Sequence, residues 1–174
     1  MSNDRHAAHS QLDTMRHSCA HVMAAAIQSI WPDAQFGVGP TIDNGFYYDV
    51  LLTTPLVEAD LAKIETAMRK LRKKKHRFVK HDLPITEAIS RMETLKQSFK
   101  IDLLRLLQEK GSTAIQKAIE DDKTALLEKD QDGVARVSFF ETGSFTDLCR
   151  GPHVEHTGLI GKFKLQRIAG AYWR

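Results

Sequence analysis

The chain has 174 residues, 42% of them hydrophobic, and its 25 Lys and Arg against 22 Asp and Glu give a formal net charge of +3. This suits one ordinary domain, and the small positive charge neither requires nor excludes a polyanionic partner. Two cysteines, Cys19 and Cys149, exclude a disulfide-stapled scaffold and a four-cysteine zinc site. The longest apolar run, Val22 to Ile27, is too short to cross a membrane, and the N-terminus is too polar for a signal peptide, so we expect a cytoplasmic protein.

Apolar residues spaced three and four apart predict four helices. Residues 1–12 are polar and are predicted to form a flexible tail, after which Asp13 or Thr14 caps a first helix that ends at Trp31-Pro32. The other helices are expected over Leu61–Leu71, over Thr86–Leu95 with Thr86 as its cap, and around Leu103–Leu107 with Gly111 ending it.

Strands alternate irregularly with these helices. They are expected at Phe36–Pro40, Phe46–Leu52, Phe78–Asp82, Val134–Glu141, Ser144–Leu148 and Phe163–Ile168. The first two should form a hairpin that closes with positive φ at Asp43-Asn44-Gly45. A charged helical insertion is expected around 105–136. The pattern favours an α+β fold, with a mainly antiparallel sheet packed against helices, over a doubly wound sheet.

Two residue pairs have the spacing of a chemical site. His17 and His21 lie one helical turn apart, roughly opposite the apolar stripe, so they face a cleft or solvent. Cys149 and His153 repeat the interval around Gly151-Pro152, which requires a bend or the start of a helix. Together they could form a tetrahedral metal site or an acid-base cluster around an ester. The alternatives are a solvated histidine pair, a buried structural cysteine and a turn histidine.

Basic residues gather between Arg69 and Arg77, and a second group comprises Lys162, Lys164, Arg167 and Arg174. Such a run is either the solvated face of a helix or a footprint for nucleic-acid phosphates. The sequence contains no Gly-rich phosphate loop, no dinucleotide-binding fingerprint and no serine nucleophile elbow, so ATP-driven chemistry has no support.

Four blocks in order resemble the N-terminal editing region of bacterial threonyl-tRNA synthetase. They are Met15-Arg-His-Ser-Cys-Ala-His21, Gly39-Pro-Thr-Ile-Asp-Asn-Gly-Phe-Tyr-Tyr-Asp49, Phe145-Thr-Asp-Leu-Cys-Arg-Gly-Pro-His153, and Phe163-Lys-Leu with Ala169-Gly-Ala-Tyr-Trp-Arg174. The likeness covers Leu12 to Arg174 and is weakest around 105–136. It implies a two-layer editing domain over 13–174, without the aminoacylation and anticodon-binding domains and without a preceding small ubiquitin-like domain. The fragment would then deacylate tRNA without charging it.

The resemblance implies hydrolysis of seryl-tRNA(Thr), and hence the serine-bearing acceptor end of tRNA(Thr) and the rest of the synthetase as partners. Carried over by position, the cleft comprises His17, His21, Lys100, Asp147, Cys149 and His153, with Gly39 and Tyr48 shaping the serine pocket. Lys100 is placed through Phe99-Lys-Ile-Asp-Leu-Leu104, where the family has Tyr-Lys-Val-Glu-Leu-Ile, and Lys117 and Lys123 are its rivals. We expect His17 to act as general base with Asp147 orienting the water, Lys100 to stabilise the oxyanion or hold the ribose, and Cys149 to form a pocket wall.

Related alanyl-editing proteins hold zinc with the corresponding two histidine pairs, whereas threonyl-editing domains generally act without a metal. We therefore expect no obligatory zinc, although His17, His21, Cys149 and His153 could bind it. Two other functions stay open. One is a non-catalytic module that binds the tRNA acceptor end, and the other is a zinc-dependent hydrolase, against which the absence of a Glu between His17 and His21 counts.

Overall fold

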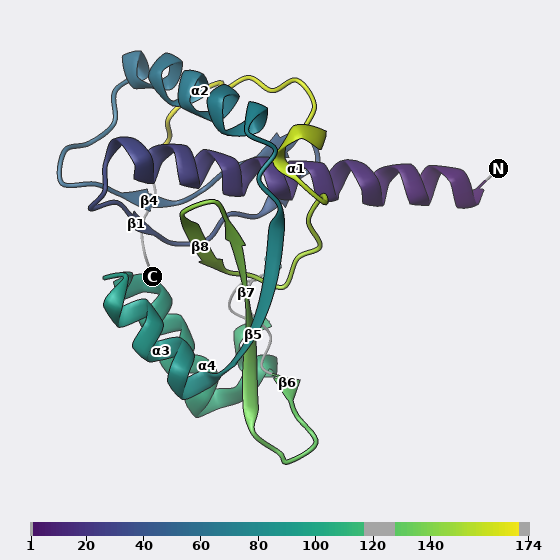
Figure 1. Cartoon of the computed structure of the whole chain (residues 1–174), viewed down its shortest axis with the longest axis vertical. Coiled ribbons are helices and arrows are strands. Elements are labelled where there is room, and N and C mark those ends of the chain that lie inside the picture. Colours follow the sequence, from purple (N-terminus) through teal and green to yellow (C-terminus); the bar gives the residue numbers. More distant parts are fainter. Residues whose placement is uncertain (1, 117–127, 171–174) are drawn as a thin grey trace.

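A computed structural model describes residues 2–116 and 128–170, which form an α+β fold as predicted (Figure 1). The helical elements are α1 (Ser2–Ile30), α2 (Glu58–Lys73), α3 (Ile85–Thr94), α4 (Ser98–Gln116) and the 3₁₀ turn η1 (Thr157–Leu159). The strands are β1 (Gln35–Phe36), β2 (Thr41–Ile42), β3 (Gly45–Phe46), β4 (Val50–Leu51), β5 (Phe78–Pro84), β6 (Glu128–Lys129), β7 (Ala135–Thr142) and β8 (Phe145–Leu148). None of the helices in the described ranges has the length and apolar character that a membrane span requires.

Helix α1 begins at Ser2, so the prediction that it starts at Asp13 or Thr14 is wrong, and residues 2–12 of the predicted tail are helical. The apolar spacing that predicts the helix begins only at Met15. No glycine or proline lies between Ser2 and Ile30, so nothing in the sequence interrupts the backbone hydrogen bonds. The helix ends at Ile30, as the following Trp31-Pro32 predicts. Its N-terminal half extends beyond the rest of the fold (Figure 1).

The predicted hairpin is present in two short ladders. Strand β1 pairs with β4 and β2 pairs with β3, both antiparallel, with Phe36 opposite Val50 and Thr41 opposite Phe46. Gly45 pairs with Ile42 as part of β3, and positive φ occurs at neither Asn44 nor Gly45. The predicted turn position is therefore confirmed, but its predicted positive φ is wrong.

The main sheet is antiparallel and centred on β7. Strand β5 runs along one edge of β7, with Phe78 opposite Thr142 and Pro84 opposite Arg136. The other edge is shared, because β6 pairs with the start of β7 and β8 pairs with its end. Figure 1 shows that β5 and β7 run from the vicinity of α1 to helices α3 and α4.

Two predicted helix boundaries are wrong. Strand β5 leads directly into α3 with Pro84 at the N-cap, so Thr86 lies inside the helix and does not cap it. Helix α4 continues past Gly111 to Gln116, because one glycine inside a helix costs only about 1 kcal/mol relative to alanine. The insertion expected around 105–136 thus begins within α4. Residues 117–127, which include Lys117 and Lys123, lie outside the described residues.

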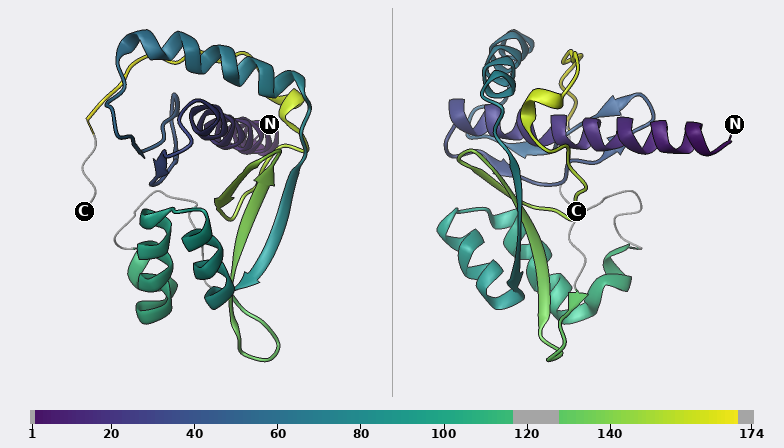
Figure 2. Two further views of the ribbon diagram at one scale, coloured as in Figure 1. Left: turned by 60° about the vertical axis from the view of Figure 1, so that its left-hand side comes forward. Right: turned by 45° about the vertical axis from the view of Figure 1, so that its right-hand side comes forward.

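The strand predicted over Phe163–Ile168 is absent from the described structure, where this segment runs without a β partner. Its alternating pattern has another cause, because Phe163 and Leu165 pack against the core while their neighbours face solvent. The segment runs alongside α2 (Figure 2), and the backbone N–H of Leu165 donates to the Glu65 carboxylate at 2.8 Å.

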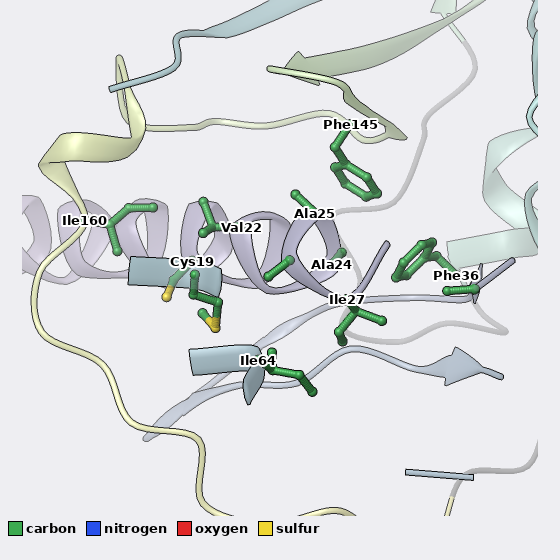
Figure 3. Packing of buried hydrophobic residues seen from close by; sticks show 12 residues of the cluster. Cys19, Val22, Ala24, Ala25, Ile27, Phe36, Ile64, Phe145 and Ile160 are labelled. Carbon is green, nitrogen blue, oxygen red and sulfur yellow. The ribbon is translucent and has the colours of Figure 1, made fainter. Parts of the chain in front are cut away.

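Two apolar clusters form the core. The first packs α1 against α2 and the hairpin, and Figure 3 shows Cys19, Val22 and Ile27 together with Ile64, Phe36 and Phe145. The second lies between α3, α4 and the sheet and includes Met92, Leu104 and Phe139. Strand β8 contributes Phe145 to the first cluster and Leu148 to the second. Residues at the end of β8 are therefore anchored from both sides.

Candidate functional site

His17 and His21 project from α1 into the interior of the molecule. Both side chains are buried, and their ring centroids lie 4.9 Å apart, as expected for residues one turn apart. The sequence predicted that these side chains face either a cleft or solvent, and their burial excludes solvent. Burial, followed by electrostatic interactions with His17 and Lys100, holds the pKa of His21 well below its ordinary 6.5. His21 is consequently a neutral imidazole at neutral pH.

Cys149 and His153 lie on the bend that follows β8, as predicted. The backbone N–H of Cys149 donates to the Ser138 carbonyl at 3.1 Å, and the Ser138 hydroxyl donates to the Cys149 carbonyl at 2.7 Å, so β7 fixes the start of the bend. Gly151 has φ +76°, and a Cβ at this position would lie 2.9 Å from Cζ of Phe140. A glycine is therefore required here for both its backbone conformation and its lack of a side chain.

The two pairs meet at the Cys149 sulfur. Nε2 of His17 lies 2.8 Å from Sγ of Cys149, and Nε2 of His153 lies 3.4 Å from the same atom. The backbone N–H of Gly151 also donates to this sulfur at 3.1 Å. One ligand-type atom from each of His17, His21, Cys149 and His153 lies within 4.8 Å of the others. The convergence expected from the sequence spacing is thus present.

A second polar group adjoins this cluster. Nζ of Lys100 lies 2.9 Å from Oδ1 of Asp147, and both side chains are buried. The hydroxyl of Tyr48 donates to Oδ2 of Asp147 and lies 3.3 Å from Nζ of Lys100. Nε2 of His21 is 3.7 Å from Oδ2 of Asp147, so His21 links the two groups. The sequence left Lys117 and Lys123 as alternatives to Lys100, and in the structure Lys100 lies in the site with Tyr48 and Asp147.

Gly39 lies under the ring of Tyr48. A Cβ built on Gly39 would be 2.4 Å from Cδ2 and 2.5 Å from Cε2 of that ring, closer than real carbon atoms approach. The absence of a side chain at Gly39 therefore allows the position from which Tyr48 reaches Asp147. Of the two residues assigned to the serine pocket from the sequence, Tyr48 contacts the Lys100–Asp147 pair and Gly39 lies against the Tyr48 ring.

A small pocket reaches Lys100 and Asp147 from the side of the α3–α4 junction. Its lining includes Phe36, Gln97, Lys100, Phe145, Thr146 and Asp147. The backbone N–H of Phe36 donates to the side-chain oxygen of Gln97 at 2.9 Å, and the amide nitrogen of Gln97 donates to the Ala34 carbonyl at 3.0 Å. These bonds attach the start of the hairpin to the α3–α4 junction and hold that wall of the pocket.

Comparison with known proteins shows which sequences this chain resembles. Residues 129–171 match the family described as the threonyl and alanyl tRNA synthetase second additional domain. The chain is 39% identical over 162 residues to a threonine–tRNA ligase of Acetivibrio thermocellus, and 42% identical over 164 residues to one of Marinobacter nauticus. These alignments cover 93% and 94% of the chain, respectively, and 22% of each relative.

The chain corresponds to the editing-domain segment of threonyl-tRNA synthetases. The resemblance inferred from the four sequence blocks is thereby confirmed. The chain spans about a fifth of the length of the curated relatives it matches. The matched family domain contains Asp147, Cys149 and His153, whereas His17, His21, Tyr48 and Lys100 come from the part of the chain before it.

Some residues of this synthetase segment that contact the cluster were not predicted from the sequence. The ring of His153 stacks on Phe78 with centroids 4.5 Å apart and an interplanar angle of 5°, and Phe140 contacts it edge-on at 4.5 Å. Ser18, completely buried, lies 3.1 Å from Nδ1 of His153. The only sequence signal for Ser18 is its place beside His17 on the helix. Phe78 begins one predicted strand and Phe140 lies near the end of another, and nothing in their spacing indicates a histidine neighbour.

The donor set of the cluster is one that zinc accepts, and threonyl and alanyl synthetases share the matched domain. Ligands of a tetrahedral zinc ion lie roughly 3.3–3.6 Å apart, given Zn–N of about 2.0 Å and Zn–S of about 2.3 Å. The 3.4 Å between Cys149 and His153 fits this spacing. The 2.8 Å between His17 and Cys149 is a hydrogen-bond distance, so an ion would have to spread this pair. The donor atoms lie within 4.8 Å of one another, so the pairs wider than this spacing would also have to close. The residues fit zinc in donor type, and their positions would need these two adjustments.

Cys19, the second cysteine, serves the core. It packs among α1 and α2 side chains (Figure 3), and burial raises the pKa of its thiol to about 12 despite the lowering effect of Arg72. It remains a neutral thiol at physiological pH, with the role of a small hydrophobic residue.

Proposed function

We propose that this chain is a proofreading hydrolase that deacylates seryl-tRNA(Thr) by attack of water on the aminoacyl ester. The observation that carries this proposal is the meeting of the imidazoles of α1 with the Asp147–His153 bend and with Lys100. Such a site combines a proton acceptor, a water-orienting carboxylate and a cation within one buried cluster, which is the set that ester hydrolysis requires.

The need for this activity follows from substrate chemistry. A synthetic pocket that accepts threonine also admits serine, which has the same amine and hydroxyl and one methyl fewer. Exclusion of the smaller side chain is worth only about 1–3 kcal/mol, so a second and smaller site has to remove the error. Tyr48, held over Gly39, would form the wall against which the additional methyl of threonine clashes.

In the proposed reaction, His17 accepts a proton from water as the water oxygen bonds to the ester carbonyl carbon. Asp147 orients that water, and the ammonium of Lys100 stabilises the oxyanion or holds the terminal ribose. The bond between the carbonyl carbon and the ribose oxygen then breaks, and the proton returns from His17 to the ribose hydroxyl. Cys149 forms a wall of the pocket, and serine and free tRNA(Thr) leave.

The proposal includes editing without an obligatory metal. A zinc ion held by His17, His21, Cys149 and His153 would supply Lewis-acid polarisation at this position. Metal analysis of protein purified without chelator tests this point. We expect less than stoichiometric zinc and an unchanged deacylation rate after chelation, whereas stoichiometric zinc with loss of rate on chelation would favour the zinc-dependent hydrolase.

The main test is deacylation of tRNA(Thr) charged with labelled serine. His17→Ala and Asp147→Ala should each reduce kcat by about 10²-fold or more, the usual range for loss of a general base or its partner. His81→Ala is the control, because His81 lies on β5 and pairs with Glu141 outside the cluster. Wild-type rates in both site variants would contradict the assignment.

A second function, binding of the tRNA acceptor end without catalysis, is favoured by one specific observation. Lys73, Lys74 and Lys75 are exposed where α2 ends, and none of them has a carboxylate partner among the described residues. Steady-state release of serine separates the two functions, because a binding module would retain affinity for seryl-tRNA without releasing its amino acid.

A further inference from the structure

Ser18 makes three polar contacts with its hydroxyl, although the reaction described above gives it no part. Its Oγ donates to the Thr14 carbonyl at 2.8 Å, accepts from the backbone N–H of Val154 at 3.0 Å, and lies 3.1 Å from Nδ1 of His153. The side chain is completely buried. The hydroxyl therefore joins α1 directly to the bend that contains Cys149 and His153.

The number of hydrogens that the Ser18 hydroxyl can donate decides which partner donates in its contact with His153. A serine hydroxyl has one hydrogen to donate and two lone pairs to accept with. The Thr14 carbonyl can only accept, so it takes the single hydrogen of Ser18, and the N–H of Val154 occupies one lone pair. The remaining lone pair faces Nδ1 of His153, which must then carry a hydrogen and donate it to Ser18.

The protonation of Nδ1 determines whether Nε2, the other nitrogen of the same ring, carries a hydrogen. A neutral imidazole carries one N–H, and the hydrogen bond made by one nitrogen sets which of the two it is. With Nδ1 protonated, Nε2 has a lone pair, and this nitrogen is the one 3.4 Å from Sγ of Cys149. The faces of the ring lie between Phe78 and His17, both stacked at 4.5 Å, so the polar contacts are at its edge.

We propose that Ser18 is a positioning residue that holds His153 in its Nδ1–H tautomer and directs the Nε2 lone pair of His153 toward the sulfur of Cys149, which His17 also contacts. The effect on catalysis rests on the proposed function, whereas the tautomer is a property of the protein alone. Ser18 touches no reacting atom, and its influence passes through His153 to the proton acceptors of the cluster.

The first experiment measures the tautomer in the wild-type chain. Protein with ¹⁵N-labelled histidine, treated with chelator, is studied by NMR at about pH 8, where an ordinary imidazole is neutral. The His153 resonances are assigned by their loss in His153→Gln. We expect a protonated Nδ1 and an unprotonated Nε2 in His153. A protonated Nε2 with a bare Nδ1 would overturn the proposal without any reference to activity.

The second experiment compares Ser18→Ala with Ser29→Ala. Ser29 is a matched control, since its hydroxyl also donates to a carbonyl of α1, that of Ala26 at 2.7 Å, and it is exposed. Ser18→Ala should shift His153 toward the Nε2–H tautomer and lower kcat for seryl-tRNA deacylation about tenfold, with KM little changed. Ser29→Ala should change neither.

These results separate the two proposals. If Ser18→Ala leaves the tautomer and kcat as they are in the wild type, the positioning role is wrong. If the wild type has the Nδ1–H tautomer, and Ser18→Ala alters it, but no variant deacylates seryl-tRNA, then the proposed function is wrong and the tautomer assignment stands.

Discussion

The ammonium of Lys100 and the carboxylate of Asp147 form a buried ion pair, with 2.9 Å between Nζ and Oδ1 and only 3% of each side chain exposed. Such a pair has a double consequence. Removal of one partner leaves the other charge without compensation in the interior, and it also removes the cation or the carboxylate from the site. Stability and activity must therefore be separated by experiment.

Lys100→Met should lower the free energy of unfolding by about 3–5 kcal/mol, because Asp147 is left as an uncompensated buried charge. Adding Asp147→Asn removes that charge, so the double variant should recover part of the stability while deacylation stays lost. Urea unfolding and seryl-tRNA deacylation measure the two effects. If the double variant is as unstable as Lys100→Met, the two charges do not interact as the structure indicates.

Gly39 provides a test of the pocket wall. Gly39→Ala places a carbon 2.4–2.5 Å from the Tyr48 ring, so the ring must move and its hydrogen bond to Asp147 must weaken. We expect deacylation to fall at least tenfold. Gly45→Ala in the same hairpin is the control, since a Cβ there meets nothing within 4 Å. Equal activity in the two variants would show that the ring position does not matter.

Local sequence patterns predicted the backbone geometry around the two residue pairs, whereas Lys100, Asp147, Tyr48 and Gly39 were assigned from the family resemblance. The four-residue interval of His17 with His21 predicted two side chains that point the same way from one helix. The interval of Cys149 with His153 predicted a pair on a bend or at the start of a helix, and His17 and His153 both contact the Cys149 sulfur. Gly151 and Pro152 correctly indicated a bend. These predictions succeeded because helix geometry and glycine or proline conformations are determined by neighbours along the chain.

Long-range contacts could not be predicted in the same way. The ring stacking of Phe78 on His153 and the contact of Ser18 with His153 depend on how distant segments pack, which no spacing encodes. The strand predicted over Phe163–Ile168 failed for a related reason. Its alternating pattern reports one buried face, and here the partner is helix α2, while the described part of the chain offers no neighbouring strand to pair with.

The exposed lysines at the end of α2, Lys73, Lys74 and Lys75, allow a test of tRNA contact. Lys73→Gln and Lys74→Gln should each weaken binding of tRNA(Thr), and each lysine that contacts a phosphate should reduce the slope of log K against log salt concentration by about 1. Lys80→Gln is the control, because Lys80 already pairs with Asp82 at 3.1 Å on the outer strand. Unchanged salt slopes in both lysine variants would identify the basic run between Arg69 and Arg77 as a solvated helix face.

Glu65 connects α2 to the segment that follows η1, and this link should depend on pH. Its buried carboxylate accepts from the N–H of Leu165 at 2.8 Å and lies 2.5 Å from Arg69 and 3.2 Å from Lys164. Burial raises the pKa of Glu65, but the Leu165 hydrogen bond and the Lys164 and Arg69 cations outweigh it and lower the pKa below its ordinary 4.5.

Because the folded state lowers the pKa of Glu65, ionised Glu65 stabilises the fold above pH 4.5, and this contribution is lost as the pH falls through the lowered value. Glu65→Gln should therefore reduce the free energy of unfolding by about 1–3 kcal/mol at neutral pH and by progressively less as the solution is acidified. Urea unfolding at a series of pH values measures the difference. Glu58→Gln, at the exposed start of the same helix, is the control. A destabilisation of Glu65→Gln that is the same at neutral and acidic pH would mean that the carboxylate acts through its shape and hydrogen bond, and that its charge contributes nothing to holding the segment against α2.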